Sequence, residues 1–255
     1  MEYNHSIWTP VIISLLFVLY IYIRDKFKRE PITSVLATYF VGICGGLVLL
    51  FLYYWLNIPT VNDIPSDYGW ELICEFFGGA CLDQLFMLII LYLLLRHNIF
   101  ADEHTDRMVY AVCIAMGVIT TKDVAFCLTS SSHPMFTIGV LRCIALIPIF
   151  FACGIMLGYY CSSLKIKKIP FLSIKLPVLI IIPIFFQFFL SYVFIIFDIY
   201  FGLIGSYIFL FFLVVLGLTV YMICSHAIES SQVRDVEEKK VKSMYDTSRY
   251  IGKKK

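Results

Sequence analysis

Long apolar stretches recur along most of the 255-residue chain, separated by short polar connections. Each stretch has about the 20 residues that an α-helix needs to cross the hydrocarbon core of a bilayer. The pattern predicts an all-α, polytopic helical membrane bundle. Its seven expected transmembrane helices lie at roughly 7–23, 33–57, 71–95, 108–128, 135–160, 171–197 and 202–224.

The fourth expected helix differs from the others. Residues 108–128 are only moderately apolar and carry Lys122 and Asp123 near their end. Because charged side chains are costly against lipid, we expect this helix to face other helices.

Composition agrees with a membrane protein and excludes a soluble domain. The chain is 60% hydrophobic and 15% charged, with a mean hydropathy of +0.87. Soluble domains are about 45–50% apolar and about 25% charged. No basic face with exposed aromatic residues is evident, so nucleic acid is not an expected partner, whereas the lipid bilayer is.

Lysine and arginine are distributed unevenly among the connections. Those after the first, third and fifth expected helices are basic, and those after the second, fourth and sixth contain neither residue. The basic residues are Arg24, Lys26, Lys28, Arg29, Arg96, Arg107, Lys165, Lys167, Lys168 and Lys175. Since basic loops stay in the cytoplasm, the N-terminus is predicted outside and the C-terminus inside.

Two regions follow from these patterns. Residues 1–224 form a transmembrane helical domain, and residues 225–255 form a charged cytoplasmic tail. The tail is expected to be a short helix or a disordered extension. Its final three lysines serve solubility or contact anionic headgroups.

Small and aromatic residues have expected roles in packing and anchoring. Gly42 and Gly46 are four residues apart on one helix, as are Gly154 and Gly158 on another, a spacing that lets helix backbones approach closely. Aromatic residues near helix ends, Tyr53 among them, are expected at the membrane interfaces.

Polar side chains inside the predicted helices are the candidates for function. Asp83 and Gln84 lie near mid-depth of the third helix, and Gln187 lies in the sixth. One interpretation is interhelical hydrogen bonding, with Gln84 and Gln187 satisfying each other or a backbone carbonyl. The other is a residual metal or proton site made from Asp83, Asp123 and Gln187.

Three charged residues are predicted near the outer helix ends. Asp123 pairs with Arg142 or Lys122 in one interpretation, which lowers the cost of inserting both charges. In the other, Lys122 extends to the outer interface.

Four collinear stretches resemble the PrsW family of intramembrane metalloproteases. They are "YIRDKFKREP" from residue 22, "ADEHTDRMVYAVCIAMG" from 101, "CGIMLGYY" from 153 and "IPIFFQFFLSY" from 182. The resemblance implies a bacterial cytoplasmic-membrane location. It also implies a metal site made of an adjacent Glu pair, a further Glu and two His on separate helices.

Carried onto this sequence, that site is degenerate. The Glu pair falls on Asp83-Gln84, the Glu-Asn of the next helix on Lys122-Asp123, and the last His on Gln187. No histidine is predicted at mid-membrane depth. The five histidines, in termini, loops or helix ends, are His5, His97, His104, His133 and His226.

Three hypotheses follow. In the favoured one, the chain is a non-catalytic pseudoprotease with no metal or other cofactor that binds a transmembrane partner. The second is an active intramembrane metalloprotease with a divergent site, which requires zinc because a hydrolytic site needs a bound metal with one open position. The third is a small transporter or channel.

Overall fold

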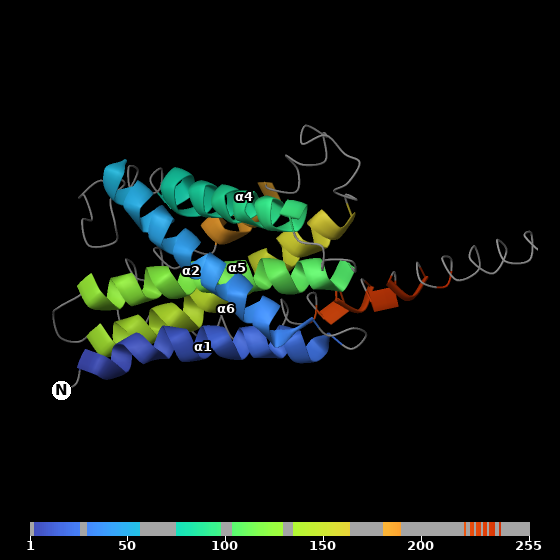
Figure 1. Cartoon of the computed structure of the whole chain (residues 1–255). Coiled ribbons are helices and arrows are strands. Elements are labelled where there is room, and N and C mark those ends of the chain that lie inside the picture. The colour runs from blue at the N-terminus through green and yellow to red at the C-terminus, as the bar shows by residue number, and fades with distance from the viewer. Residues whose placement is uncertain are drawn as a thin grey trace, which may run out of the picture.

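The structure is a computed structural model that describes residues 3–25, 30–56, 75–97, 104–129, 135–163 and 181–189, together with 222, 225–226, 228–230, 232–233, 235–237 and 240. Regular structure within these ranges is helical and includes no strand. The elements in Figure 1 are α1 (Tyr3–Arg24), α2 (Ile32–Trp55), the π-helical segment η1 (Glu75–Cys81), α4 (Leu82–His97), α5 (His104–Thr129) and α6 (Met135–Ser163). Residues 181–189 form a further short helical stretch.

The first five expected helices correspond to α1, α2, η1 with α4, α5 and α6. The third was expected as one regular helix, and its first described turns are instead π-helical. Of the sixth, 171–197, the structure describes residues 181–189 as helix. The seventh, 202–224, lies outside the described residues except for Met222.

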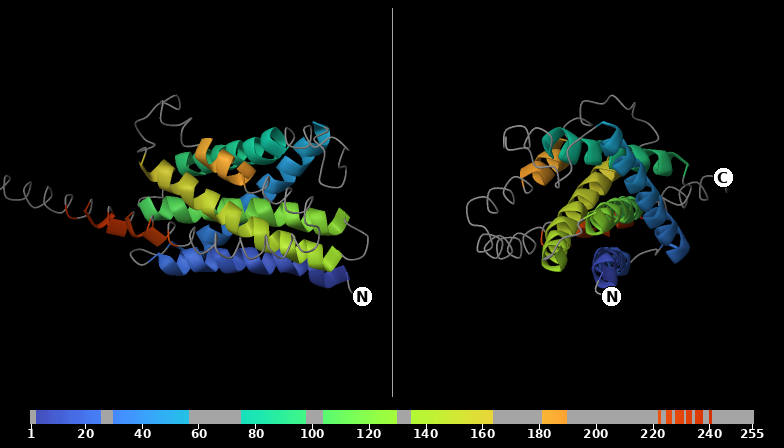
Figure 2. Two further views of the ribbon diagram at one scale, coloured as in Figure 1. Left: turned by 180° about the vertical axis from the view of Figure 1, so that it is seen from behind. Right: turned by 90° about the vertical axis from the view of Figure 1, so that its left-hand side faces the viewer.

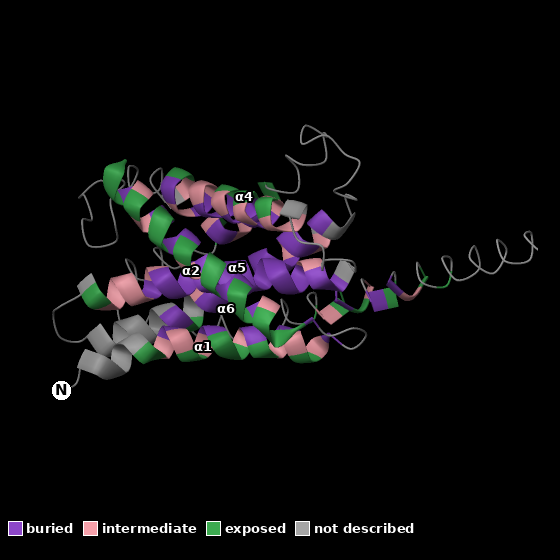
Figure 3. Cartoon of the chain, in the orientation of Figure 1, coloured by how far each residue is buried: buried purple, intermediate pink, exposed green. Residues whose placement is uncertain are grey.

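Helix α5 forms the centre of the bundle. It packs against α1, α2, α4 and α6, and every residue from 108 to 121 is buried (Figure 3). The end-on view in Figure 2 places α1 and α4 on opposite sides of it. The prediction that the moderately apolar fourth helix faces other helices is confirmed, and its polar side chains therefore avoid lipid.

Glycine permits a close crossing of α2 and α5. A Cβ added to Gly42 would lie 2.5 Å from the carbonyl oxygen of Ile114, and one added to Gly117 would lie 2.4 Å from that of Tyr39. A Cβ on Gly46 would lie 2.7 Å from Thr121 Cβ. Because real Cβ atoms essentially never come within 3.0 Å of another heavy atom, the two helices cannot lie this close with larger residues.

The crossing of α5 and α6 uses the second glycine pair. A Cβ on Gly154 would lie 2.9 Å from the Cα of Val112, and one on Gly158 would lie 2.5 Å from the Cα of Met108. Both glycine pairs found by their spacing thus lie against the backbone or side chains of α5.

Three buried hydroxyl groups join α1, α2 and α5. Ser14 Oγ lies 2.9 Å from the Tyr39 hydroxyl, which lies 3.0 Å from Thr120 Oγ1. Thr120 Oγ1 lies 2.7 Å from Ser14 Oγ and 2.6 Å from the Met116 carbonyl. The three hydroxyl groups thus supply one another's hydrogen bonds, which buried polar groups need because they have no contact with water.

Long apolar helices face the surroundings of the bundle. Ile32–Trp55, Phe76–Leu95 and Thr105–Leu128 have the length and composition to cross a membrane, and Trp8–Arg24 and Leu146–Tyr159 are shorter apolar helices. Large apolar side chains on α2 such as Phe40 and Phe51 are more than half exposed. These surfaces are typical of contact with lipid, and the chain is an integral membrane protein.

The first part of the expected tail is packed on the bundle. Ile228, Gln232 and Asp235, at helical spacing, are all buried. Gln232 Nε2 donates to the Arg24 carbonyl at 2.8 Å, and Asp235 Oδ2 accepts from the Thr105 backbone N–H at 3.2 Å and from its hydroxyl at 2.8 Å. For these positions the structure favours the short helix over the disordered extension.

Candidate functional site

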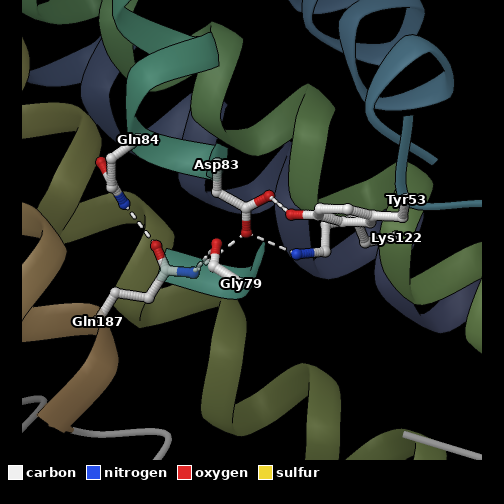
Figure 4. Close-up of polar contacts among 6 residues, drawn as sticks. All are labelled: Tyr53, Gly79, Asp83, Gln84, Lys122 and Gln187. Carbon is white, nitrogen blue, oxygen red and sulfur yellow. Dashed lines mark hydrogen bonds and ion pairs between the residues drawn. The ribbon is translucent and has the colours of Figure 1, made fainter. Parts of the chain in front are cut away.

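Five polar side chains converge where α2, α4, α5 and the 181–189 stretch meet. We call this cluster the polar centre; it comprises Tyr53, Asp83, Gln84, Lys122 and Gln187, and Figure 4 shows its contacts. Four of these five residues stand at positions where the resemblance places the metal site. The structure therefore brings together residues remote in the chain, such as Asp83 and Gln187, which are 104 positions apart.

Asp83 is the acceptor at the middle of the polar centre. Its side chain is 0% exposed. The Tyr53 hydroxyl donates to Oδ1, while Lys122 Nζ lies 2.5 Å from Oδ2 and Gln187 Nε2 donates to the same oxygen at 3.1 Å. An ionised carboxylate in the membrane is costly unless it is paired and hydrogen-bonded. Here both oxygens have donors, and one has a cation.

The two glutamines continue the network from Asp83. Gln84 Nε2 donates to Gln187 Oε1 at 2.6 Å, and Gln187 Nε2 also lies 3.3 Å from the Gly79 carbonyl. Gln84 Oε1 is buried and has no hydrogen-bond partner among the described residues. The interpretation of these residues as interhelical hydrogen-bond partners named two contacts, one between the two glutamines and one with a backbone carbonyl. The structure contains both, the second with the carbonyl of Gly79.

Lys122 points into the bundle. Its side chain is 15% exposed, and Nζ lies 5.2 Å from the centroid of the Tyr53 ring and 5.7 Å from that of Phe150. Its extension to the outer interface was therefore a wrong expectation, because a buried carboxylate and two ring faces compete with water for the ammonium.

The expected ion pair of Lys122 with Asp123 also needs correction. Asp123 is fully buried next to it on α5, but the salt bridge of Lys122 is with Asp83 on α4. Adjacent residues on a helix point about 100° apart, so Lys122 and Asp123 face different neighbours. The side chain of Arg142 lies outside the described residues, and its expected pairing with Asp123 stays a prediction.

The π-helical segment η1 leads directly into the polar centre. It ends at Cys81, two residues before Asp83, and the Gly79 carbonyl within it accepts the bond from Gln187. The wider π turn breaks the regular i→i−4 ladder and is often found at functional sites. Ring contacts of Phe76 with Phe185 and Phe188, at 5.8 and 5.0 Å, hold the 181–189 stretch against the same segment.

Sequence reasoning missed Tyr53. It was expected among the interfacial aromatics, but it is 7% exposed and bonds Asp83, whereas its neighbour Tyr54 is 83% exposed. The available signal was helical phase: Tyr53 follows Leu49, Gly46 and Gly42 by 4, 7 and 11 residues, spacings that place all four on one face of a helix, and all four are buried.

A second buried contact joins two of the stretches that carry the family resemblance. The Tyr110 hydroxyl donates to Glu30 Oε2 at 2.7 Å, and both residues are buried. Glu30 precedes α2, and Tyr110 lies in the second turn of α5. This pair lies near the α5 N-terminus, where the packed tail also binds, whereas Lys122 is near the other end of α5.

The residues of the polar centre do not fit a hydrolytic zinc site. Such a site needs about three nitrogen, sulfur or carboxylate ligands and an open position. The described residues contain no group of three His, Cys, Asp or Glu that could hold a metal ion. The Asp83 carboxylate is bound by the Lys122 ammonium. Gln84 and Gln187 have amide side chains, which are not among the usual zinc ligands.

None of the described histidines is among the residues of the polar centre. His5 lies in the first turns of α1, while His97 ends α4 and His104 begins α5. His226 is in the packed tail segment. His133 falls outside the described residues.

Comparison with known proteins identifies relatives of the chain. The sequence model of the PrsW family of intramembrane metalloproteases matches residues 30–220. The chain is 23% identical over 165 residues to "Protease PrsW" of Bacillus subtilis, covering 62% of this chain and 70% of that protein. It is 26% identical over 175 residues to "Protease PrsW" of Oceanobacillus iheyensis, covering 66% and 75%. No solved structure matches. Since the family model spans well over half of its length, the chain belongs to the PrsW family of intramembrane metalloproteases.

Proposed function

We propose that this chain is a non-catalytic PrsW family member that binds a transmembrane protein partner in the bacterial cytoplasmic membrane. The observation that carries the proposal is the closed network around Asp83. Its two carboxylate oxygens are already bound by Tyr53, Lys122 and Gln187. With both oxygens bound by protein donors, the carboxylate is not free to ligate a metal or to take a proton from a metal-bound water, which are the roles of carboxylates in metal-dependent hydrolysis.

Burial also bears on the two alternatives. Asp83, Asp123 and Gln84 are each 0% exposed, so water does not reach them in this conformation. A transporter or channel that used these acids would need a water-accessible path past them. An active protease with a divergent site would need access for water and for a peptide bond at the same place.

Membrane N-terminal proteomics tests the non-catalytic part and requires no known substrate. Cells that lack the chain are complemented with the natural sequence, with Gln84→Ala, or with Leu85→Ala as a control at a half-exposed neighbouring position. We expect the same set of protein N-termini in all three. A cleavage product that appears with the natural sequence and with Leu85→Ala but not with Gln84→Ala would contradict the proposal.

Crosslinking in intact membranes tests the binding part. A photo-reactive residue is placed at exposed apolar positions of α2, such as Phe40 and Phe51, and at the buried position Leu49 as a control. We expect one discrete crosslinked complex from one of the exposed positions and none from the control. A chain that crosslinks only to lipid at every exposed position of the described helices would contradict partner binding.

A further inference from the structure

The guanidinium of Arg24, at the end of α1, has an incomplete set of hydrogen-bond acceptors. Its Nε is buried and has no hydrogen-bond partner among the described residues. Its Nη2 lies 3.7 Å from Glu229 Oε1 on the packed tail, which is too far for a hydrogen bond. Nε and Nη2 form one edge of the guanidinium, and such an edge matches two oxygens of a carboxylate or a phosphate. This edge of Arg24 therefore lacks the two acceptors that it can bind.

Arg24 stands where α1 reaches the surface of the bilayer. The apolar part of this helix is Trp8–Arg24, so the arginine marks the end of the apolar stretch, and an arginine there extends to the interface. Leu19 and Ile23, four residues apart on the same helix, are 48% and 55% exposed. They form an apolar strip that the acyl chain of a lipid can cover, with its headgroup at the level of Arg24.

We propose that Arg24 binds the phosphate of an anionic lipid headgroup at the end of α1, in place of Glu229. The Glu229 side chain is 65% exposed and that of Arg24 is 26% exposed, so solvent screens their contact and holds it weakly. Once the glutamate moves aside, the long arginine side chain can turn its Nε–Nη2 edge outward, where a phosphate supplies both missing acceptors. The inference goes beyond the proposed function and does not depend on it.

The charge of the sequence around Arg24 favours an anionic headgroup over a zwitterionic one. The connection that follows α1 contains Lys26, Lys28 and Arg29, and basic clusters next to a membrane span attract anionic lipids. A zwitterionic headgroup also has a phosphate, but its own ammonium offsets that charge and is repelled by the same basic residues. Phosphatidylglycerol has no such cation and is therefore the probe.

Thermal unfolding of the full chain in nanodiscs tests the inference. The bilayers contain phosphatidylcholine alone or mixed with phosphatidylglycerol, at one ionic strength. We expect phosphatidylglycerol to raise the Tm of the natural chain, because a ligand of the folded state stabilises it. The rise should be less than half as large for Arg24→Gln.

Lys240→Gln is the matched control for general electrostatic attraction. It removes one positive charge from an exposed position of the packed tail and should keep the full response to phosphatidylglycerol. A response of Arg24→Gln equal to that of the natural chain would overturn the inference. An equal loss of response in Lys240→Gln would do the same, because the effect would then follow net charge and not the arginine.

Inorganic phosphate distinguishes a headgroup from a free anion. In phosphatidylcholine nanodiscs, sodium phosphate should raise the Tm of the natural chain no more than sodium chloride of the same ionic strength. A rise that depends on Arg24 and is as large as that with phosphatidylglycerol would overturn the assignment to a lipid.

Glu229→Gln covers the case in which Arg24→Gln does not fold. This change removes the charge that competes with the headgroup and leaves Arg24 in place. We expect the Tm to rise at a severalfold lower mole fraction of phosphatidylglycerol than in the natural chain. An unchanged or higher mole fraction would show that the lipid does not replace Glu229, and would overturn the inference.

Discussion

The tyrosine hydroxyl on Asp83 shows how much one donor matters in a bilayer. Tyr53 brings its hydroxyl from α2 to the Asp83 carboxylate on α4. The hydrogen bond therefore joins the two helices and also gives the buried carboxylate a donor. With Lys122 on the second oxygen, the carboxylate is solvated by protein groups in place of water.

Tyr53→Phe should destabilise the bundle by about 1–3 kcal/mol, because it leaves a buried acceptor with one donor fewer. Tyr54→Phe is the matched control, since its side chain is 83% exposed. Chemical unfolding in mixed micelles compares the two. Equal stability of the two variants would show that the hydroxyl is not needed at Asp83.

The polar residues of the site could be identified from the sequence, but most of their partners could not. Asp83, Gln84 and Gln187 stand out because each interrupts an apolar run. Lys122 was recognised as unusual but was either paired with Asp123 or extended to the outer interface, since its actual partner depends on the rotation of α4 relative to α5. Tyr53 gave no polar signal, because tyrosine near a helix end is common at membrane interfaces.

At the scale of the helix, glycine residues allow neighbouring helices to pack closely. The α2–α5 crossing places Gly42 and Gly117 against backbone atoms, so neither position has room for a side chain unless the two helices move apart. Gly45 differs, because an added Cβ there would meet the tip of the Ile90 side chain at 2.4 Å. A flexible side chain can move away, whereas a helix backbone cannot.

Gly117→Ala should therefore cost about 1–3 kcal/mol of stability, the range for overpacking a closely fitted interior. Gly45→Ala, on α2 but against a movable side chain of α4, should cost clearly less. The midpoint of thermal unfolding in detergent measures both. A larger loss for Gly45→Ala would contradict the close backbone crossing.

The positions of the first five helices followed from the apolar pattern, because the bilayer fixes how long each span must be. The π-helical segment did not. Residues 75–81 are as apolar as a regular helix would be, and hydropathy has no sensitivity to whether a hydrogen bond spans four residues or five. The segment contacts the 181–189 stretch through Gly79 and Phe76, and a hydropathy pattern does not show contacts between residues so remote in sequence.

At the scale of the whole molecule, the packed tail closes one end of the bundle. Figure 1 shows it at the end opposite the N-terminus. It supplies a donor to the last carbonyl of α1 and an acceptor to the first turn of α5, groups that a helix cannot satisfy internally. The additional ion pair of Arg24 with Glu229, at 3.7 Å and partly exposed, adds little.

Asp235→Ala should weaken this attachment by about 0.5–2 kcal/mol, the usual cost of losing a side-chain acceptor at a helix N-terminus. Glu237→Ala removes an exposed carboxylate from the same segment and serves as the control. Limited proteolysis of the tail in sealed vesicles is the measurement. We expect faster cleavage for Asp235→Ala alone, and equal cleavage of the two variants would contradict the contact.

The orientation of the molecule is a further prediction at this scale. The tail and Arg24 lie at one end of the bundle, together with the start of α5, and the distribution of basic residues assigns that end to the cytoplasm. A reporter enzyme fused after residue 240 should therefore be active only if it functions in the cytoplasm. Activity of a periplasmic or extracellular reporter at the same position would reverse the assignment.

The packed tail also dictates an order of assembly. Asp235 is synthesised 130 residues after Thr105, and 208 residues separate Gln232 from Arg24. A ribosome has therefore already delivered α1 and α5 to the membrane before the groups that complete their ends exist. Until translation reaches this segment, the last carbonyl of α1 and the first turn of α5 depend on water for these hydrogen bonds. The docking of this segment thus joins groups on two helices to a segment that is synthesised after both of them.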